Sequence, residues 1–550
     1  MDNNKLAELL FPDIDKTPQD YEAQYPPRSL AEGAMVTRLG PSPTGFIHLG
    51  NLYGAFVDER LAHGSDGVFY LRIEDTDDKR YVEGAVDTII DSLDFFGIRF
   101  DEGAVKDPDG KQVGKGDYGP YYQSDRGPLY RCFVKELVKK GLAYPCFMSE
   151  EEIAETRAEQ EAAKETPGIY GKYAASRDLT LEQIEANIAE GKTYVMRLRS
   201  SGDPDDPKEI TVHDGIRGEM TMPENFQDIV ILKANGIPTY HFAHACDDHF
   251  MRTTHVVRGE EWLSSLPIHV ELFDKLGFEL PVYCHTAVLM KIDENGNRRK
   301  LSKRKDPELA LDFYREKGYH PAAVSEYLLT ILNSNYEEWR AANPDTPAED
   351  FPFTMEKMST SGALFDLDKL NDVSKDTLVK IPAADLAKFL RDWAAEYRPE
   401  LKEVLADDIL LQILDLGRDG KKPRKDFICA SQMFQYISYF YDDYFEIEDE
   451  MPAEAADDKS AILKAYLATY DHSDDQSQWF DKIRAIAEDM GYAKRPKDYK
   501  KHPEDYKGHV GHVSEVIRIA LMGRRQSPDV WAIQQILGEE RTRSRIEKMI

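Results

Sequence analysis

Cysteine is scarce in this sequence. The 550 residues contain five cysteines that lie far apart and form no C-x-x-C pair. Disulfide frameworks and clustered zinc sites need cysteines in close pairs or in even number, so we expect neither. Scattered thiols fit a reducing compartment, and the sequence therefore predicts a cytoplasmic protein. The cysteines are Cys132, Cys146, Cys246, Cys284 and Cys429.

Long hydrophobic runs are absent as well. No apolar stretch approaches the ~20 residues that span a bilayer. The opening Met-Asp-Asn-Asn-Lys has neither the basic start nor the apolar stretch of a signal peptide. We therefore expect no membrane partner. With 41% hydrophobic and 31% charged residues, the composition fits a globular protein, and the length predicts two to four domains.

Positive charge is in deficit, because 70 Lys and Arg face 101 Asp and Glu, for a net charge of −31. Affinity for nucleic-acid phosphates comes mostly from Lys and Arg, so composition alone does not suggest such a partner. Net charge does not show where the charges lie, however. Each basic stretch is either a solvated face or part of an RNA-binding stripe. These stretches are residues 298–305, 421–425, 494–507 and 541–545.

The order of apolar patterns predicts an α/β domain. A β-capable run at 34–39 stops at a Gly/Pro-rich turn, and helical spacing then continues to Gly64. Residues 68–73 read as a buried strand, and a helix is expected over 82–96. Strand–helix–strand–helix order favours a doubly wound parallel sheet of the Rossmann type.

This alternation is interrupted and then resumed. The polar, mixed segment 105–225, with a long helical stretch at 149–164, predicts an inserted domain. Strand patterns return at 229–232, and further strands are expected at 255–258 and 282–289.

Beyond about residue 320 the pattern is helical, and we expect an all-α C-terminal region. Its apolar residues recur at helical spacing, as in Leu386, Phe389, Leu390 and Trp393. The aromatic run at 434–445 is interpreted as core rather than as a platform for bases. The predicted domains are an N-terminal extension (1–33), an α/β domain (34–104 and 226–320), the insertion (105–225), a linking helical domain (321–380) and an α-helical C-terminal region (381–550).

Residues 38–51 have the layout of a phosphate site. A strand ends, small residues turn tightly, and a helix begins whose free N–H groups and dipole favour negative charge. His48 at the start of this helix can donate to a phosphate, and Gly50 leaves room for a nucleotide base. Taken alone, such a turn is more often only a connection between a strand and a helix.

A second candidate site is the basic loop at residues 300–305, beyond the last predicted strand. Several fixed positive charges suit a pyrophosphate leaving group, although a basic loop by itself is usually only solvated. A doubly wound sheet would bring this loop and His48 to the same carboxyl edge, where ligands bind.

These residues resemble a known family. Pro-Ser-Pro-Thr-Gly at 41–45 with His-Leu-Gly-Asn at 48–51 resembles the first signature of class I aminoacyl-tRNA synthetases, in the form typical of glutamyl-tRNA synthetases. Lys-Leu-Ser-Lys-Arg at 300–304 resembles the second signature. Further similar segments, in the same order, are Arg-Ile-Glu-Asp-Thr-Asp (72–77), Gly-Ile-Pro-Thr-Tyr (236–240) and Val-Arg-Gly-Glu-Glu-Trp (257–262).

The resemblance implies a monomeric ligase that uses ATP with Mg²⁺, L-glutamate and tRNA(Glu). His48 and Lys303 would stabilise the ATP phosphates while the glutamate carboxylate attacks the α-phosphorus. The terminal adenosine of the tRNA would then attack the glutamyl-adenylate. The other ATP-binding residues that it implies are Pro41, Ser42, Gly45, Gly50, Asn51, Lys300, Ser302 and Arg304.

Glutamate carries two carboxylates and one ammonium, so its site needs about two cations and one anion, with arginine preferred. By resemblance, Arg38 and Arg258 are the cations and Glu74 the anion, although a structural Arg–Glu pair remains the alternative. His244 stands where some relatives carry Asn. The glutamate-binding residues implied are Arg38, Ser42, Glu74, Tyr240, His244 and Arg258.

The inserted domain departs from many relatives, because Cys146 is its one cysteine at the position of their zinc ligands, so we expect no structural zinc. By resemblance, residues 34–104 and 226–320 would be the catalytic domain, the insertion (105–225) would bind the tRNA acceptor end, and residues 321–380 would contact the tRNA stem. The helical region 381–550 resembles the bacterial type, which would read the D-arm and anticodon. Three alternatives stay open at this point: a glutaminyl-tRNA synthetase, another nucleotidyltransferase of this fold, and a non-catalytic RNA-binding paralogue.

Overall fold

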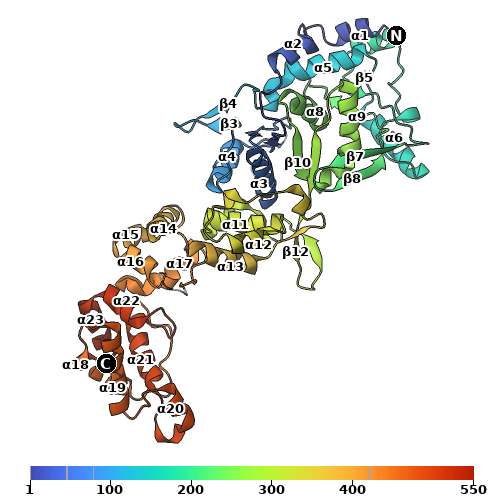
Figure 1. The fold of residues 1–550 in the computed structure, drawn as a ribbon. Coiled ribbons are helices and arrows are strands. Elements are labelled where there is room, and N and C mark those ends of the chain that lie inside the picture. The colour runs from blue at the N-terminus through green and yellow to red at the C-terminus, as the bar shows by residue number, and fades with distance from the viewer. Residues whose placement is uncertain (1, 45–46, 78–79, 419, 421–422) are drawn as a thin grey trace. The chain divides into compact units, whose positions relative to one another are not determined.

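The computed structural model describes residues 2–44, 47–77, 80–418, 420 and 423–550 (Figure 1). These residues divide into two compact units. The chain passes between the units within α10 (Leu311–Lys317), within α11 (Pro321–Leu332) and between Asp366 and Leu367. The finer domain limits expected from the sequence remain predictions. The first unit comprises Met1–Asp312 and Leu328–Asp366, and the second comprises Phe313–Tyr327 and Leu367–Ile550.

Parallel strands form the centre of the first unit. β1 pairs in parallel with β2, β2 with β3, and β10 with β11. The backbone N–H of Thr254 donates to Val36 O at 3.0 Å, so β10 begins beside β1. The predicted Rossmann-type α/β fold is therefore confirmed. The strands concerned are β1 (Val36–Leu39), β2 (Val68–Leu71), β3 (Glu102–Lys106), its antiparallel partner β4 (Gln112–Lys115), β10 (His255–Gly259) and β11 (Val282–Thr286).

Other strands extend or flank this centre. The hairpin β7–β8 joins β11 through Asp214 and Tyr283, although its residues fall within the range predicted for the insertion. The sequence placed 229–232 in the central sheet, and this is wrong, because β9 pairs antiparallel with β6. A short apolar run looks the same in either sheet. These strands are β5 (Ala143–Cys146), β6 (Val195–Leu198), β7 (Glu209–Asp214), β8 (Gly218–Pro223), β9 (Val230–Leu232), β12 (Leu289–Ile292), β13 (Arg298–Lys300) and β14 (Ala363–Leu364).

Helices of the first unit begin at recognisable caps. The Ser149 hydroxyl accepts from Glu152 N at 3.2 Å, and the Glu152 carboxylate accepts from Ser149 N at 2.8 Å, so α6 starts where the sequence predicted. α3 packs against β1 and β10. The helices of this unit are α1 (Asn3–Leu10), α2 (Pro18–Gln24), α3 (Leu49–Gly64), α4 (Ala85–Phe95), α5 (Gly127–Lys139), α6 (Glu150–Ala163), α7 (Leu181–Ala189), α8 (Tyr240–Phe250), α9 (Leu266–Leu276) and α12 (Tyr336–Ala342).

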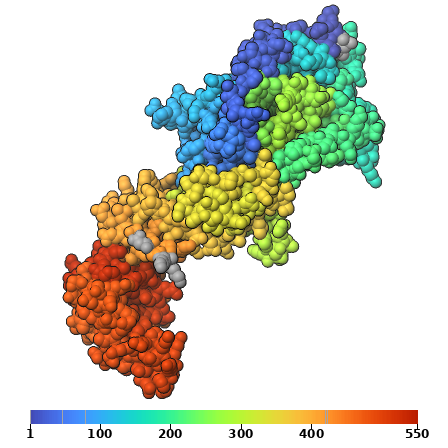
Figure 2. Space-filling view, viewed as in Figure 1, coloured from blue at the N-terminus to red at the C-terminus, as the bar shows by residue number. Residues whose placement is uncertain are grey.

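The N-terminal extension, of which the structure describes residues 2–33, is drawn in dark blue on the surface of the first unit in Figure 2. Arg28 forms a bidentate pair with Glu102 of β3, at 2.8 and 2.9 Å. Glu22 accepts from Arg252 at 2.7 Å and lies 2.6 Å from His249. The extension therefore ties β3 to the C-terminal end of α8.

The second unit is helical and has a continuous hydrophobic core. Leu386, Leu390 and Trp393 face this core, as their helical spacing predicts, and so does much of the aromatic run at 434–445. Its helices are α13 (Leu367–Leu378), α14 (Ala383–Tyr397), α15 (Lys402–Leu405), α16 (Ile409–Asp415), α17 (Ala430–Ile437), α18 (Lys459–Thr469), α19 (Gln476–Asp489), α20 (Pro496–Lys501), α21 (Val510–Met522), α22 (Val530–Leu537) and α23 (Glu539–Met549).

All five cysteines are buried free thiols. Within the described part of the chain, no helix combines the length and the apolar character needed to cross a membrane.

Candidate active site

His48 is the N-cap of α3, and its ring orientation is set there. Its Nδ1 accepts from Asn51 N at 3.2 Å, while the Asn51 side chain accepts from His48 N at 3.0 Å. With Nδ1 as acceptor, the neutral imidazole carries its proton on Nε2, which can donate to a phosphate oxygen. A Cβ at Gly50 would lie 3.0 Å from the ring, so the small residue preserves this arrangement. Of the neighbouring predicted residues, Pro41 is buried and Ser42 exposed, and Gly45 lies outside the described residues.

The basic loop lies beside His48. Ala310, a few residues after the loop, forms an antiparallel backbone bridge with His48. Burial lowers the pKa of His48, the Glu261 carboxylate opposes this, and the charges of Lys300 and Lys303 lower it further. The two motifs, which are far apart in the sequence, are therefore brought together, as the predicted sheet required.

Asp306 holds the base of this loop. Arg299 donates to it twice, at 2.6 and 2.7 Å, and Ser302 N donates at 2.8 Å. The bonds from Arg299 are the main reason that the pKa of Asp306 falls to about 2. Lys303 and Arg304 are exposed on the turn that Asp306 anchors.

A buried network of charges lies at the carboxyl ends of β1 and β2. Asp248 of α8 accepts from Arg72 Nη1 at 2.6 Å and from Arg38 Nε at 3.3 Å. Arg72 also donates to Glu74 at 3.0 Å. A Cβ at Gly40 would overlap the Glu74 carboxylate, so a larger residue there would displace this acid. Glu74, Arg38 and Asp248 thus form one cluster.

The ionisation of this cluster follows from its contacts. Burial favours the neutral form of Asp248, but Arg72 and Arg38 outweigh it and hold the pKa well below its usual value. Burial likewise opposes the charge on Arg38, yet Asp248 keeps its pKa above normal. Burial raises the pKa of Glu74 in spite of Arg72 and Arg38. The hydrogen bonds of Arg38, at 3.3 and 3.4 Å, are long, so its guanidinium keeps capacity for a ligand.

Tyr240 and His244 stack on one face of α8. Their rings are nearly parallel, with centroids 5.7 Å apart, and Trp262 covers Tyr240 at 4.4 Å. His244 is fully buried, with Nε2 3.0 Å from the Tyr283 hydroxyl and Nδ1 2.7 Å from Asp248. Burial lowers its pKa to about 4. Both of its ring nitrogens therefore face protein groups.

Arg258 of β10 is held on several sides. Its Nε donates to His285 Nε2 at 2.9 Å, and its Nη1 donates to His269 Nδ1 at 2.9 Å. The guanidinium carbon lies 4.4 Å from the centre of the Tyr283 ring. Its Nη2 is buried and has no hydrogen-bond partner among the described residues. A donor left in this way is costly unless a ligand accepts from it.

Sequence reasoning missed several groups of this site. Arg72 lay in a quoted motif without a role, and Asp248, His269 and His285 were not singled out. A signal for Asp248 was present, since two adjacent carboxylates, Asp247 and Asp248, occur in an otherwise largely apolar helix. Buried Asp is rare unless paired, so this doublet indicated cationic partners.

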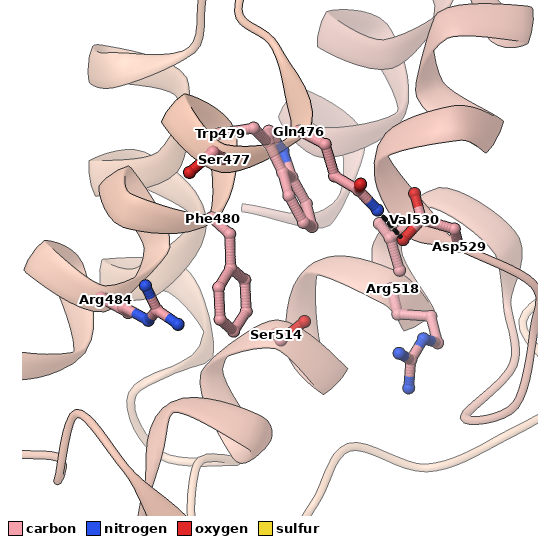
Figure 3. Close-up of a pocket in the computed structure, with 9 residues that line it drawn as sticks. All are labelled: Gln476, Ser477, Trp479, Phe480, Arg484, Ser514, Arg518, Asp529 and Val530. Carbon is pink, nitrogen blue, oxygen red and sulfur yellow. Dashed lines mark hydrogen bonds between the residues drawn. The ribbon is translucent and has the colours of Figure 1, made fainter.

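The second unit contains a cavity of about 400 Å³ between α19, α21 and the start of α22 (Figure 3). Phe480 lies under the guanidinium of Arg484, 4.5 Å from the ring centre. On the opposite side, Arg518 reaches along the cavity, and its Nε is buried without a partner among the described residues. Aromatic and guanidinium groups of this kind suit an unstacked base. The sequence analysis had not singled out these residues.

Comparison with known proteins agrees with these features. Residues 34–372 match the family model described as "tRNA synthetases class I (E and Q), catalytic domain", and residues 497–550 match "Anticodon binding domain". A glutamate–tRNA ligase of Acetivibrio thermocellus is 60% identical over the whole of both chains, and one of Clostridium perfringens (strain SM101 / Type A) is 48% identical, again over both full lengths.

A solved structure is also similar. It is a glutamate tRNA ligase from Elizabethkingia meningosepticum in complex with its amino acid, 28% identical, with a TM-score of 0.73 over 94% of this chain and 99% of that one. The chain therefore belongs to the glutamate–tRNA ligases, within the class I tRNA synthetases.

Proposed function

We propose that this ligase activates L-glutamate with ATP at the site around Arg38, Arg258 and His48, and transfers it to the 3′-terminal adenosine of tRNA(Glu). The observation that carries the proposal is the convergence of two buried arginines and one buried acid, Glu74, at the ends of β1, β2 and β10. Arg38 donates to Val257 O, the neighbour of Arg258, so the two cations lie on adjacent strands.

Glutamate matches these charges group by group. Arg258 Nη2, buried and without a protein partner among the described residues, suits the side-chain carboxylate. Arg38 has free capacity for a carboxylate as well, and Glu74 suits the ammonium. The ring of Tyr240 closes this space beside Trp262. We propose that His244 acts through Asp248 and the Tyr240 ring, because its Nδ1 lies 2.7 Å from Asp248 and its Nε2 lies 3.0 Å from the Tyr283 hydroxyl.

ATP is assigned to the N-terminal end of α3. The helix dipole and the Nε2 proton of His48 favour phosphate there, and Lys300, Lys303 and Arg304 add positive charge beside it. As the carboxylate of glutamate attacks the α-phosphorus, the bond to pyrophosphate breaks and charge builds on the leaving oxygens. The basic loop stabilises that charge, and no protein nucleophile is required.

Magnesium fits this site as a partner of ATP. Mg²⁺ takes hard oxygen ligands, and the Glu261 carboxylate is close enough to His48 to oppose the lowering of the His48 pKa. Glu261, together with phosphate oxygens, would hold the ion, which neutralises phosphate charge when it is bound.

The cavity lined by Phe480 and Arg518 is proposed to bind an anticodon base of the tRNA. A base can stack on Phe480 while Arg518 and Ser514 bond its edge. Part of the cavity lies inside the matched anticodon-binding region. With the tRNA as its partner, we propose a monomer that acts in the cytoplasm, which its free thiols favour. Light scattering of the purified chain, with and without tRNA, measures the first of these two properties.

ATP–pyrophosphate exchange with tRNA present tests the assignment. Glutamate should support exchange and glutamine should not, which separates this activity from that of a glutamine enzyme. Arg38→Ala and Arg258→Ala should each raise the KM for glutamate far more than the KM for ATP. If both variants keep the normal glutamate KM while they fold normally, the proposed pocket is not the glutamate site.

A further inference from the structure

The substrate arginine Arg258 is held by two histidines that themselves continue into longer chains of hydrogen bonds. On one side lie His285 and Asp214, and on the other lie His269 and His241. The histidines His285 and His269 and the carboxylate of Asp214 are fully buried, although none of them belongs to a signature motif.

Asp214 determines the tautomer of His285. Its carboxylate accepts from the backbone N–H groups of Ile216 and Arg217, both at 2.9 Å, and from that of His285 at 3.1 Å. Burial opposes its charge, but the bonds from His285 and from these amides outweigh burial and keep the pKa of Asp214 below normal. Because the ionised carboxylate only accepts, the His285 Nδ1 that lies 2.6 Å away must carry the proton.

The other nitrogen of His285 is then a lone pair aimed at Arg258. An arginine always donates, so the 2.9 Å contact between Arg258 Nε and His285 Nε2 requires a neutral ring with Nε2 free of hydrogen. Burial lowers the pKa of His285, and the positive charge of Arg258 also lowers it, which keeps the ring neutral.

The same reasoning applies on the other side. His269 Nδ1 accepts from Arg258 Nη1, so His269 carries its proton on Nε2 and donates it to His241 Nδ1 at 2.9 Å. Burial, followed by the charges of neighbouring groups, holds the pKa of His269 well below normal. Two neutral imidazoles thus fix two edges of the guanidinium, and Nη2 is the nitrogen left for the substrate.

We infer that Asp214, His285 and His269 are positioning residues that aim Nη2 of Arg258 at the side-chain carboxylate of glutamate. This inference rests on the proposed role of Arg258. The carboxylate oxygens of Asp214 need touch no substrate, because they act through the tautomer of His285. A carboxylate would have been as effective a partner for Arg258 as the imidazoles, but it would have neutralised the cation that the substrate needs. Neutral acceptors orient the arginine and leave its charge available.

Asp214→Asn is the sharpest test, because it keeps the shape of the side chain. The amide nitrogen would donate to His285 Nδ1, move the ring proton to Nε2 and set it against Arg258 Nε–H. In exchange assays with tRNA present we expect the glutamate KM to rise about 10- to 100-fold, with the ATP KM nearly unchanged and a reduced preference for glutamate over glutamine.

His285 offers a matched pair of variants. His285→Gln can place its side-chain oxygen where Nε2 lies and should keep much of the normal glutamate KM, whereas His285→Leu should raise it as Asp214→Asn does. Thermal unfolding of each variant shows whether it folds. If Asp214→Asn folds and leaves the glutamate KM unchanged, or if His285→Gln is as impaired as His285→Leu, the inference is wrong.

Arg258→Ala separates this inference from the function on which it rests. If Arg258→Ala raises the glutamate KM and Asp214→Asn does not, only the positioning role fails. If Arg258→Ala itself leaves the glutamate KM unchanged, the assignment of Arg258 to the glutamate site fails instead.

Discussion

Replacing Asp248 with Asn should destabilise the first unit strongly. Arg72 Nη1 lies 2.6 Å and Arg38 Nε 3.3 Å from this carboxylate, and all three side chains are at least nine-tenths buried. Asparagine keeps the shape but removes the negative charge that both buried arginines contact. Arg38 then loses its carboxylate partner, and among the described residues Arg72 keeps only the carboxylate of Glu74 within hydrogen-bond distance. Breaking a buried pair on one side costs about 3–5 kcal/mol. The substitution changes little else in the packing, so this cost should appear almost entirely in the free energy of unfolding.

The expected shift in Tm follows from the size of the unit. For the roughly 350 residues of the first unit, the entropy of unfolding converts 3–5 kcal/mol into a fall in Tm of about 4 to 7 °C. Differential scanning calorimetry suits this measurement, because two compact units can unfold as separate transitions. Only the transition assigned to the first unit should move.

Asp94→Asn is the matched control. Asp94 accepts from Arg99 at the same distance of 2.6 Å, but both side chains are well exposed, at 71% and 63%. Exposed pairs contribute little, so this variant should change Tm by about 1 °C or less. If Asp248→Asn lowers Tm by no more than Asp94→Asn does, Asp248 is not the anchor of the two arginines.

Three further predictions concern the loop, the tRNA and acid. Lys303→Ala should lower the rate of adenylate formation about 10²- to 10³-fold and leave tRNA binding normal. Lys305→Ala in the same loop should change that rate little. Equal rates for the two variants would remove Lys303 from the mechanism. The affinity for tRNA should fall linearly on a log–log plot against salt, and Arg518→Ala should weaken it further; a flat response to salt would mean that phosphates are not contacted. His244 takes up a proton near pH 6.5 in the unfolded chain and only near pH 4 in the folded chain. The contribution of the neutral His244 to the free energy of unfolding is therefore full above pH 6.5 and is lost as the pH falls towards 4. The Tm of His244→Asn should fall less between pH 6.5 and pH 4 than the Tm of the unsubstituted protein. If Tm depends on pH equally in both proteins, His244 is not a neutral buried ring.

The parts of the site that could be predicted are local in the sequence. They are short segments whose chemistry follows from adjacent residues, and their order in the chain indicated the family: the turn at 41–45, His48 and the basic loop. The same short segment ends the strand, forms the turn and begins the helix, so it also marks the edge of the sheet where ligands bind. Hence the fold class and the meeting of His48 with the loop followed from the sequence.

The groups that escaped prediction depend on distant partners. Arg38 and Asp248 are 210 residues apart, and Asp214 meets His285 across 71 residues. An Asp in an apolar stretch indicates a cationic partner but not which residue supplies it, since that depends on which strands become neighbours. The sheet assignment of 229–232 failed for the same reason, because a short strand does not encode its partner.

A structure with a non-hydrolysable analogue of glutamyl-adenylate tests the central claim most directly. We expect the side-chain carboxylate of the bound analogue within hydrogen-bond distance of Arg258 Nη2 and its amino group beside Glu74. Its phosphate should lie next to His48 and the basic loop. An analogue bound with its carboxylate away from Arg258, or with its phosphate away from the N-terminal end of α3, would contradict it.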